Sequence, residues 1–232
     1  MKIMTFNTQH CGSYLDGLRI DYRLFAEAIR GVDADVVGLN EIRGVGRDAG
    51  YDAQTDILAE LAGYPYHHFS EAIKFEGVNP YGNGLLSRER IVMLETLPIP
   101  APEIKSGSDW YEDRILTKAT LESGLTVMTV HVGLNRDEKE LAIKTILENI
   151  ESKKCILMGD FNMDPDDTLI DKIREKLRDT GMGADEKTFP SDAPMRRIDY
   201  IFVSPDIKVL RTETPALVIS DHLPYVVEIE LI

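Results

Sequence analysis

The stretch Ile156–Asp164, ILMGDFNMD, decides how the rest of this chain is interpreted. Residues 155–158 are apolar and lie between lysines and a glycine, which is typical of a buried strand. Asp160 and Asn162 follow at its carboxyl end, two positions apart, so on an extended chain their side chains point to the same face. A carboxylate that accepts a proton, beside an amide that donates hydrogen bonds, suits a site that directs water at an oxyanion. Both residue types also favour turns, so an ordinary turn is the alternative.

A calcium loop is a third interpretation of the same stretch. The pattern Asp160-x-Asn162-x-Asp164 matches the start of such a loop, and Asp171 stands where the loop needs a bidentate acid. Pro165 occupies the position that requires glycine for a sharp bend, and a strand rather than a helix precedes the loop. These departures disfavour calcium binding.

The composition limits the class of protein. The chain has 232 residues, of which 43% are hydrophobic, and this suits one α/β domain spanning residues 1–232. Lysine and arginine number 26 against 40 aspartate and glutamate, a formal net charge of −14. Proteins that bind duplex DNA gain affinity by placing basic residues on phosphates, so this charge disfavours a nucleic-acid partner. The net charge still permits a small anionic substrate, provided that the site holds a metal or a few suitably placed cationic side chains.

The location of the protein is predicted from its cysteines and its apolar segments. Cys11 and Cys155 do not indicate a disulfide framework, so a reducing compartment is expected. Residues 2–6 enter a strand without a signal-peptide core, and no run approaches the roughly 18 apolar residues of a membrane span. We therefore expect a cytoplasmic protein with no membrane span. Its oligomeric state is not predicted.

Strands and helices alternate along the chain. Hydrophobic periodicity predicts helices over residues 22–30, 55–61, 137–150 and 168–177. Strands are expected over residues 2–6, 34–39, 66–72, 84–87, 91–97, 115–121, 125–130, 155–158, 197–203, 217–219 and 225–231. Two irregular segments, 98–113 and 181–194, separate some of these elements, and such long loops are often functional.

Several predicted strands end in polar side chains that a core does not need: Asn7, Glu41, His131, Asp160 with Asn162, and Asp221 with His222. Sites in α/β folds usually gather at the carboxyl ends of strands. Asp199 lies instead inside the apolar run 197–203, where an unpaired carboxylate would be costly. His222 is the partner we expect for it, because a buried carboxylate orients an imidazole and favours its charged form. Taken singly, each residue has a simpler explanation as a cap, an ion pair or a loop residue.

The motifs, taken in order, resemble those of the endonuclease/exonuclease/phosphatase superfamily of DNase-I-like metal-dependent phosphohydrolases. They are Thr5-Phe6-Asn7, Leu39-Asn40-Glu41, Gly82–Arg88, Arg114, His131, Gly159–Asn162, Arg197–Ile201 and Ser220–Pro224. The resemblance implies a four-layer α/β/β/α sandwich of two packed mixed sheets flanked by helices. It also implies hydrolysis of phosphoester bonds by direct attack of water, with no covalent enzyme intermediate.

The resemblance further implies a metal ion and residues around it. A divalent cation, Mg²⁺ or alternatively Mn²⁺, would be held by Glu41, Asn7 and Asp221. This agrees with the preference of Mg²⁺ for a few hard oxygen ligands, with water and substrate phosphate as the rest. The residues expected to contact substrate are Asn7, His10 and Asn83.

The resemblance also implies which residues carry the reaction: Asp160, Asn162, His222, Asp199, His131 and Arg114. Asp160 would orient or deprotonate the attacking water, and Asn162 would donate to the phosphoryl oxygens. His222, supported by Asp199, would stabilise the charge of the transition state. His131 and Arg114 would contact the scissile phosphate.

Departures from the family pattern narrow the expected function. Asn40 stands where many members have glutamine, a change that we expect to be without consequence. Gln9 replaces an acid found in some nucleases, so a second metal is not assumed. His131 resembles DNase-type and sphingomyelinase-type members more than abasic-site endonucleases. We therefore expect a Mg²⁺-dependent hydrolase of a phosphorylated small molecule, lipid headgroup or other phosphodiester substrate. The alternatives are a nuclease and a non-enzymatic binding module on the same fold. The natural substrate, the choice between monoester and diester and the metal count are not predicted.

Overall fold

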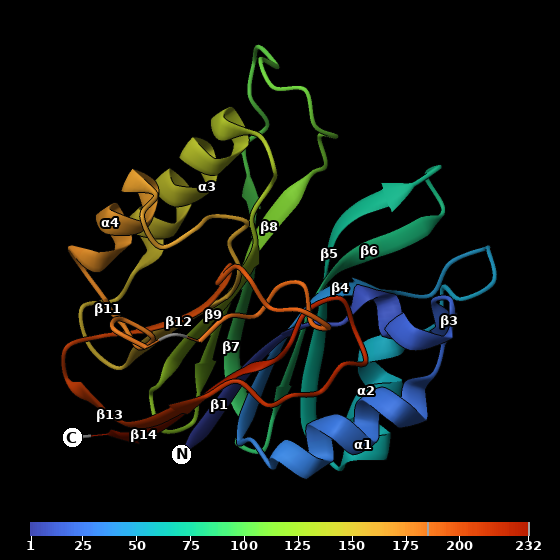
Figure 1. The fold of residues 1–232 in the computed structure, drawn as a ribbon, viewed down its shortest axis with the longest axis horizontal. Coiled ribbons are helices and arrows are strands. Elements are labelled where there is room, and N and C mark those ends of the chain that lie inside the picture. The colour runs from blue at the N-terminus through green and yellow to red at the C-terminus, as the bar shows by residue number, and fades with distance from the viewer. Residues whose placement is uncertain (185, 232) are drawn as a thin grey trace.

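A computed structural model of the protein describes residues 1–184 and 186–231. Two six-stranded sheets form its centre, and helices lie on their outer sides (Figure 1). The short elements β2 (Gly12–Ser13), β3 (Arg19–Ile20) and the 3-10 turns Gln9–Cys11 and Tyr14–Asp16 follow the first strand. The expected four-layer α/β/β/α architecture is confirmed.

The first sheet has the strand order β13-β14-β1-β4-β6-β5. Its strands are β1 (Lys2–Asn7), β4 (Val36–Arg43), β5 (Tyr66–Phe75), β6 (Asn79–Ser87), β13 (Ile207–Glu213) and β14 (Tyr225–Leu231). The pair β1 and β4 is parallel, whereas the other neighbours are antiparallel. The helices α1 (Tyr22–Val32) and α2 (Gln54–Ala62) pack on its outer face through one apolar cluster (Figure 1).

The second sheet has the strand order β11-β12-β10-β9-β8-β7. Its strands are β7 (Ile91–Ile99), β8 (Arg114–Leu121), β9 (Thr126–His131), β10 (Cys155–Asp160), β11 (Arg178–Asp179) and β12 (Asp199–Val203). Here β9 and β10 are the parallel pair. The helices α3 (Arg136–Asn149) and α4 (Thr168–Arg174) cover its outer face. Each sheet is therefore mixed, as expected.

Strand β10 shows why the run at 155–158 is apolar on both faces. Ile156 and Met158 pack between the two sheets, whereas Cys155 and Leu157 pack toward α3 and α4. Side chains alternate along a strand, so a strand with a sheet on one side and helices on the other needs apolar residues at every position.

In β1, β4, β9 and β10, the inward-facing side chains change from apolar to polar at one edge of the molecule. Ile3, Val36, Val127 and Ile156 belong to the cluster between the sheets. Four polar residues lie an even number of positions further along the same strands, so their side chains face the same way: Asn7, Asn40, His131 and Asp160. All four are buried. The core between the sheets therefore ends in a layer of polar side chains.

Two glycines allow the sheets and strands to approach at this edge. A Cβ at Gly38 would lie 2.8 Å from the Met158 side chain of the facing sheet. Gly159 has φ +146°, and a Cβ there would lie 1.8 Å from the carbonyl oxygen of Val130. Neither position tolerates a larger residue without movement of its neighbours, and Gly159 directly precedes Asp160.

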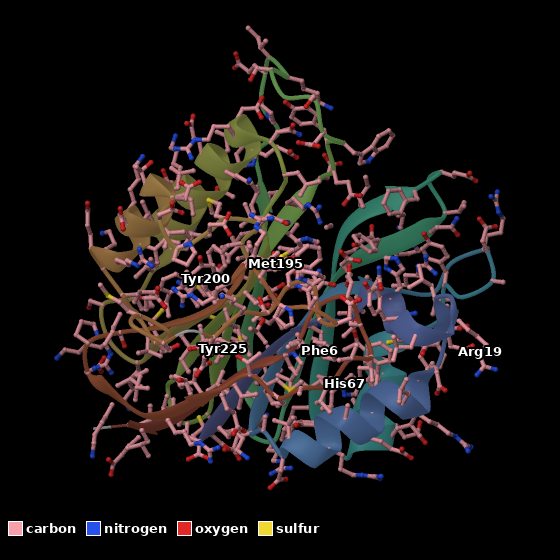
Figure 2. All side chains as sticks on the ribbon, in the orientation of Figure 1. Phe6, Arg19, His67, Met195, Tyr200 and Tyr225 are labelled. Carbon is pink, nitrogen blue, oxygen red and sulfur yellow. The ribbon has the colours of Figure 1, made fainter. Side chains whose placement is uncertain are left out.

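Large aromatic side chains fill the interior. Phe6, Tyr200 and Tyr225 are fully buried, whereas Arg19 extends from the edge of the molecule (Figure 2). Tyr200 stacks on Phe202, with ring centroids 5.3 Å apart. Within residues 1–184 and 186–231, no helix is long and apolar enough to cross a membrane.

The sequence-based element boundaries need several corrections. The prediction missed β13, because its half-exposed positions place charged residues among apolar ones at a sheet edge. Residues 217–219 are not a strand; they turn into the segment that contains His222. Strand β4 runs past Leu39 to Arg43, and the fourth helix ends at Arg174 instead of residue 177.

We predict that Leu157→Ala lowers the free energy of unfolding by about 2–5 kcal/mol, the usual cost of truncating a fully buried leucine. Leu157 is inaccessible to solvent in the helix-facing core. Leu210→Ala is the matched control, because that side chain is 53% exposed at the edge strand. Chemical denaturation of both variants measures the difference. Equal effects would contradict the assigned packing.

Candidate active site

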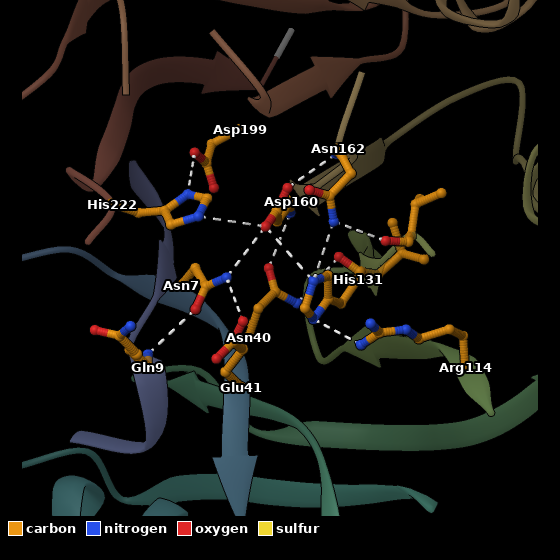
Figure 3. A network of polar contacts seen from close by, with 12 residues as sticks. Asn7, Gln9, Asn40, Glu41, Arg114, His131, Asp160, Asn162, Asp199 and His222 are labelled. Carbon is orange, nitrogen blue, oxygen red and sulfur yellow. Dashed lines mark hydrogen bonds and ion pairs between the residues drawn. The ribbon is translucent and has the colours of Figure 1, made fainter. Parts of the chain in front are cut away.

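Asp160 lies at the centre of the polar layer (Figure 3). Its side chain is 2% exposed. The amide of Asn7 donates to Oδ2 at 3.1 Å, and the backbone N–H of Asn162 donates to Oδ1 at 2.9 Å. Nε2 of His131 and Nε2 of His222 lie 3.5 and 3.6 Å from Oδ2. The carboxylate thus stands between two imidazoles that come from separate parts of the chain.

Asn40 holds Asp160 from the opposite sheet. Its Oδ1 accepts from the backbone N–H of Asp160 at 2.9 Å. Its Nδ2 donates to the carbonyl oxygen of Val130 at 3.0 Å and to Oδ1 of Asn83 at 2.9 Å. Asn40 is inaccessible to solvent, so no water competes for these bonds. A single amide therefore connects strands of both sheets and fixes the backbone that carries Asp160.

The expected pairing of Asp199 with His222 is present in the structure. Oδ2 of Asp199 and Nδ1 of His222 are 2.8 Å apart, and both side chains are almost completely buried. Burial alone would lower the pKa of His222, but the charges of Asp199 and Asp160 outweigh it and raise this pKa to about 10. His222 is therefore an imidazolium at neutral pH, with Nε2 directed at Asp160.

His131 has the opposite charge state. Burial, followed by the charge of Arg114, holds the pKa of His131 well below its usual value. Nη1 of Arg114 lies 2.9 Å from Nδ1 of His131. Because arginine can only donate and forms the shorter contact, Nδ1 accepts and the proton of the neutral ring is on Nε2, which faces Asp160. The NH₂ group of Asn162, 3.3 Å from Nε2, then donates to Val132 and not to the ring. Nη2 of Arg114 also contacts Glu112 at 3.0 Å.

Burial raises the pKa of Asp160 to about 6, with Asp199 acting in the same direction and His222 opposing it. A carboxyl group with this pKa is ionised at neutral pH yet is a stronger base than an exposed aspartate. Groups of this kind suit general base catalysis near neutral pH. The arrangement can therefore accept a proton from water beside a fixed positive charge.

A β-bulge in β4 determines the direction in which the side chain of Glu41 points. The register of β4 against β6 shifts between Leu39 and Ile42, and Glu41 has φ +58°. Without the bulge, Glu41 would continue the helix-facing series of Leu39, because side chains alternate along a strand. Instead its carboxylate accepts from Nδ2 of Asn7 at 3.1 Å and belongs to the polar layer.

The residues around Glu41 fit a divalent cation. Burial raises the pKa of Glu41 to about 7, and the anions Asp221 and Asp160 add to this effect. Carboxylates that raise the pKa of a neighbouring buried carboxyl group favour a bound cation, which would relieve the repulsion. One feature differs from the expectation: Asn7 turns its NH₂ group toward Glu41, and its Oδ1 accepts from the backbone of Gln9 at 3.2 Å. Asn7 would have to rotate to act as a ligand.

A second cluster of potential ligand atoms, in the described ranges, is Asp160, Asp199 and His222, all within 4.8 Å of one another. Nδ1 of His222 is already paired with Asp199, and the ring is positively charged. The imidazolium therefore neutralises this cluster itself. Glu41 and Asp221 are the better candidates for the metal.

The remaining predicted residues take different positions. His10 lies at the rim, with Nδ1 3.7 Å from Glu41, and burial lowers its pKa to about 4, so it is neutral. Asn83 is buried, and its Oδ1 is used by Asn40. The NH₂ group of Asn162 donates to the carbonyl oxygen of Val132 at 2.9 Å. A contact between substrate and either amide therefore stays a prediction.

The geometry does not support the calcium-loop interpretation. Asp164 forms an ion pair with Arg196 at 2.8 Å, and Asp171 forms one with Arg174 at 2.9 Å. These two carboxylates are half-exposed or exposed and are held by separate arginines. They do not join Asp160 around one point.

Sequence reasoning missed Asn40, which it treated as a substitution without consequence. The signal was present in the spacing, because Asn40 has the inward-facing parity of Val36 and Gly38 and directly precedes Glu41. A buried amide at such a position must find partners, and here they lie in the opposite sheet.

We expect Asn40→Ala to lower the free energy of unfolding by about 2–5 kcal/mol, since it leaves buried partners in both sheets unpaired. Any activity of the site should fall about tenfold or more, because the backbone of Asp160 loses its anchor. Asn149→Ala is the control, because this partly buried amide at the end of α3 donates only to the carbonyl oxygen of Thr145 in its own helix. Unchanged stability in Asn40→Ala would show that the amide does not join the sheets.

The raised pKa of His222 predicts a pH dependence of stability. The pKa in the unfolded chain is near 6.5 and in the folded protein about 10, so the charged pair stabilises the fold fully below pH 6.5. This stabilisation is lost as the pH rises from about 6.5 to about 10. The difference in unfolding free energy between the wild type and His222→Gln should therefore shrink over that interval. A difference that grows with pH would contradict the charge assignment.

Comparisons with known proteins were consistent with this geometry. The sequence profile described as the Endonuclease/Exonuclease/phosphatase family matches residues 4–222. No curated protein sequence matches the chain. An endonuclease/exonuclease/phosphatase from Beutenbergia cavernae has a TM-score of 0.78 and 23% identity, covering 100% of this chain and 71% of that one.

Two further solved structures show the range of proteins with this fold. A mannosyl-6-phosphatase from Bacteroides thetaiotaomicron has a TM-score of 0.75 and 18% identity, with 100% of both chains covered. TDP2 from D. rerio, in complex with a single-strand DNA product, has a TM-score of 0.67 and 16% identity, covering 99% of this chain and 98% of that one. At these identities the likeness establishes the fold alone.

Proposed function

This chain belongs to the endonuclease/exonuclease/phosphatase family, and we propose that it is a divalent-metal-dependent hydrolase of phosphoric esters. One observation carries the proposal: Oδ2 of the buried Asp160 lies between a neutral His131 and a charged His222. A base beside a fixed cation suits attack of water on a phosphoryl group.

In this proposal each residue has one task. Asp160 accepts the proton of the attacking water, and its pKa near 6 keeps it ionised at neutral pH. The imidazolium of His222, held by Asp199, neutralises charge that develops on the phosphoryl oxygens. Arg114 holds His131 in the tautomer that directs Nε2–H inward, and both are available to the scissile phosphate. Asn162 fixes Asp160 through its backbone N–H.

Glu41 and Asp221 would hold the metal, with Asn7 as an additional ligand after rotation of its amide. Mg²⁺ fits this oxygen-rich set, and Mn²⁺ is an alternative. When bound, such an ion supplies charge stabilisation to the phosphate and the leaving oxygen. In this proposal His10, which is neutral and lies 3.7 Å from Glu41, would contact substrate at the rim.

The proposed substrate is a phosphorylated small molecule or lipid headgroup. The net charge of −14 disfavours a polyanionic nucleic acid. The similar fold of a mannosyl-6-phosphatase is compatible with a sugar phosphate. A cytoplasmic location is part of the proposal, and the free, buried Cys11 and Cys155 are consistent with a reducing compartment.

Hydrolysis of a chromogenic phosphodiester and of the matching monoester, with Mg²⁺ and with chelator, tests the function. Turnover should require the metal and should fall about 10²–10⁴-fold in Asp160→Asn, the usual loss for a positioned base. The stability of this variant should change little, because the hydrogen bond lost to the new NH₂ group is offset by removing the cost of ionising a buried carboxyl group.

Asp164→Asn is the matched control for that experiment. Asp164 follows the same strand, but its carboxylate is 44% exposed and pairs with Arg196. Turnover should be retained in this variant. Full activity of Asp160→Asn, or equal losses in both variants, would overturn the mechanism, and the ratio of diester to monoester rates would narrow the substrate class.

A further inference from the structure

Tyr81 is a polar side chain of the inward-facing series that the proposed reaction does not use. On β6, Leu85 packs between the two sheets, and Asn83 belongs to the polar layer, where its Oδ1 accepts from Asn40. Tyr81 lies two positions before Asn83, so its side chain points to the same face. It is 6% exposed. The phenol ring therefore enters the polar layer from the first sheet.

Two aromatic rings fix the ring of Tyr81 at the rim of the candidate site. The ring centroids of His10 and Phe75 lie 5.7 and 5.5 Å from that of Tyr81, in edge-on and tilted arrangements. Nδ1 of His10 in turn lies 3.7 Å from Oε2 of Glu41. The side chains of His10 and Glu41 are 30% and 22% exposed, so solvent reaches this part of the site. The ring of Tyr81 therefore has a fixed position beside an accessible part of the polar layer.

The hydroxyl group of Tyr81 lies near charged residues that serve the proposed reaction. Burial raises the pKa of Tyr81 well above its usual value, the charges of Glu41 and Glu112 add to this effect, and Arg114 opposes it. In the proposed function Glu41 would hold the metal, and Arg114 is available to the scissile phosphate. The hydroxyl group therefore keeps its proton at neutral pH, at a place that both the metal and the phosphate would approach.

The phenolic proton of Tyr81 has no acceptor in the part of the chain that the structure describes. Arg114 acts on the hydroxyl group as a donor, because arginine has no acceptor, and this leaves the proton free. The oxygen is not fully buried, so a ligand can reach it. The other buried tyrosines each have a partner for the hydroxyl group: Tyr64 the carbonyl oxygen of Ala34, Tyr200 that of Met163, and Tyr225 Oγ1 of Thr180. Because buried polar groups are normally paired, the free proton of Tyr81 indicates a partner from outside the chain.

We propose that Tyr81 is a further substrate-binding residue, whose hydroxyl group donates a hydrogen bond to an oxygen of the bound phosphate group. The inference rests on the proposed function, which places this phosphate beside Glu41 and Arg114. Arg114 begins β8 in the second sheet, whereas Tyr81 belongs to β6 in the first. The phosphate is then held by donors from both sheets. A hydrogen bond to a charged oxygen is stronger than one to a neutral acceptor, so the contact favours an anionic ligand.

Calorimetric titration of the full chain with inorganic phosphate, in the presence of Mg²⁺, tests this contact without any turnover. Tyr81→Phe keeps the ring contacts with His10 and Phe75 and removes only the hydroxyl group. The dissociation constant for phosphate should rise about tenfold in this variant, since a hydrogen bond to a charged group is lost. Its free energy of unfolding should change little, because the hydroxyl group donates to no described residue. An unchanged dissociation constant would overturn the inference.

Tyr64→Phe is the matched control. Tyr64 is also buried, but its hydroxyl group donates to the carbonyl oxygen of Ala34 at 2.7 Å in the helix-facing core of the first sheet. This variant should be less stable than the wild type and should bind phosphate with the same affinity. The two variants thus separate the loss of a structural hydrogen bond from the loss of a ligand contact. Equal effects of both on phosphate binding would contradict the role of Tyr81.

Carbon-13 NMR of labelled tyrosine separates this inference from the proposed function. The signal of Cζ of Tyr81, assigned by its absence in Tyr81→Phe, should shift with phosphate in a saturable manner. Such a shift without turnover of any phosphoric ester would support the contact and overturn the hydrolysis. Metal-dependent turnover with no shift, and with equal KM in the wild type and Tyr81→Phe, would overturn the contact and leave the function intact. Neither phosphate binding nor turnover in the wild type would overturn both.

Discussion

The buried pair of Asp199 and His222 sets the charge of the candidate site. Removing one partner of such a pair leaves an uncompensated charge in the interior, so neither residue is replaceable alone. The pair places a positive charge 3.6 Å from Asp160, while burial and the charge of Arg114 keep His131 neutral on the other side. Two histidines with the same intrinsic pKa thus take opposite states, and the environment of each is the cause.

The fold supplies these positions through the alternation of its strands. The inner face of each sheet is apolar along most of its length and turns polar at one edge, so the site is the end of the core between the sheets. Two local irregularities of the strands complete the candidate site. The bulge in β4 turns Glu41 into the polar layer, and Gly159 lets β10 approach β9 beside Asp160. Asn40 then fixes the two sheets to each other.

Periodicity and strand-end chemistry predicted much of this from the sequence. The apolar run before Asp160 predicted a central strand, and a carboxylate inside the apolar run 197–203 predicted a histidine partner. The edge strand β13 was missed, because a half-exposed strand has a weak apolar pattern. Spacing along β4 indicates that Asn40 faces inward, but the atoms that it contacts in the opposite sheet depend on how the layers pack. The same holds for the orientation of the Asn7 amide.

The protonation of the two histidines, measured by nitrogen-15 NMR of their imidazole rings at neutral pH, tests the charge arrangement around Asp160 most directly. His222 should carry protons on both nitrogens, and His131 should carry a single proton on Nε2. A neutral His222, or a charged His131, would contradict the charge arrangement around Asp160. The proposed hydrolysis would then need another source of positive charge.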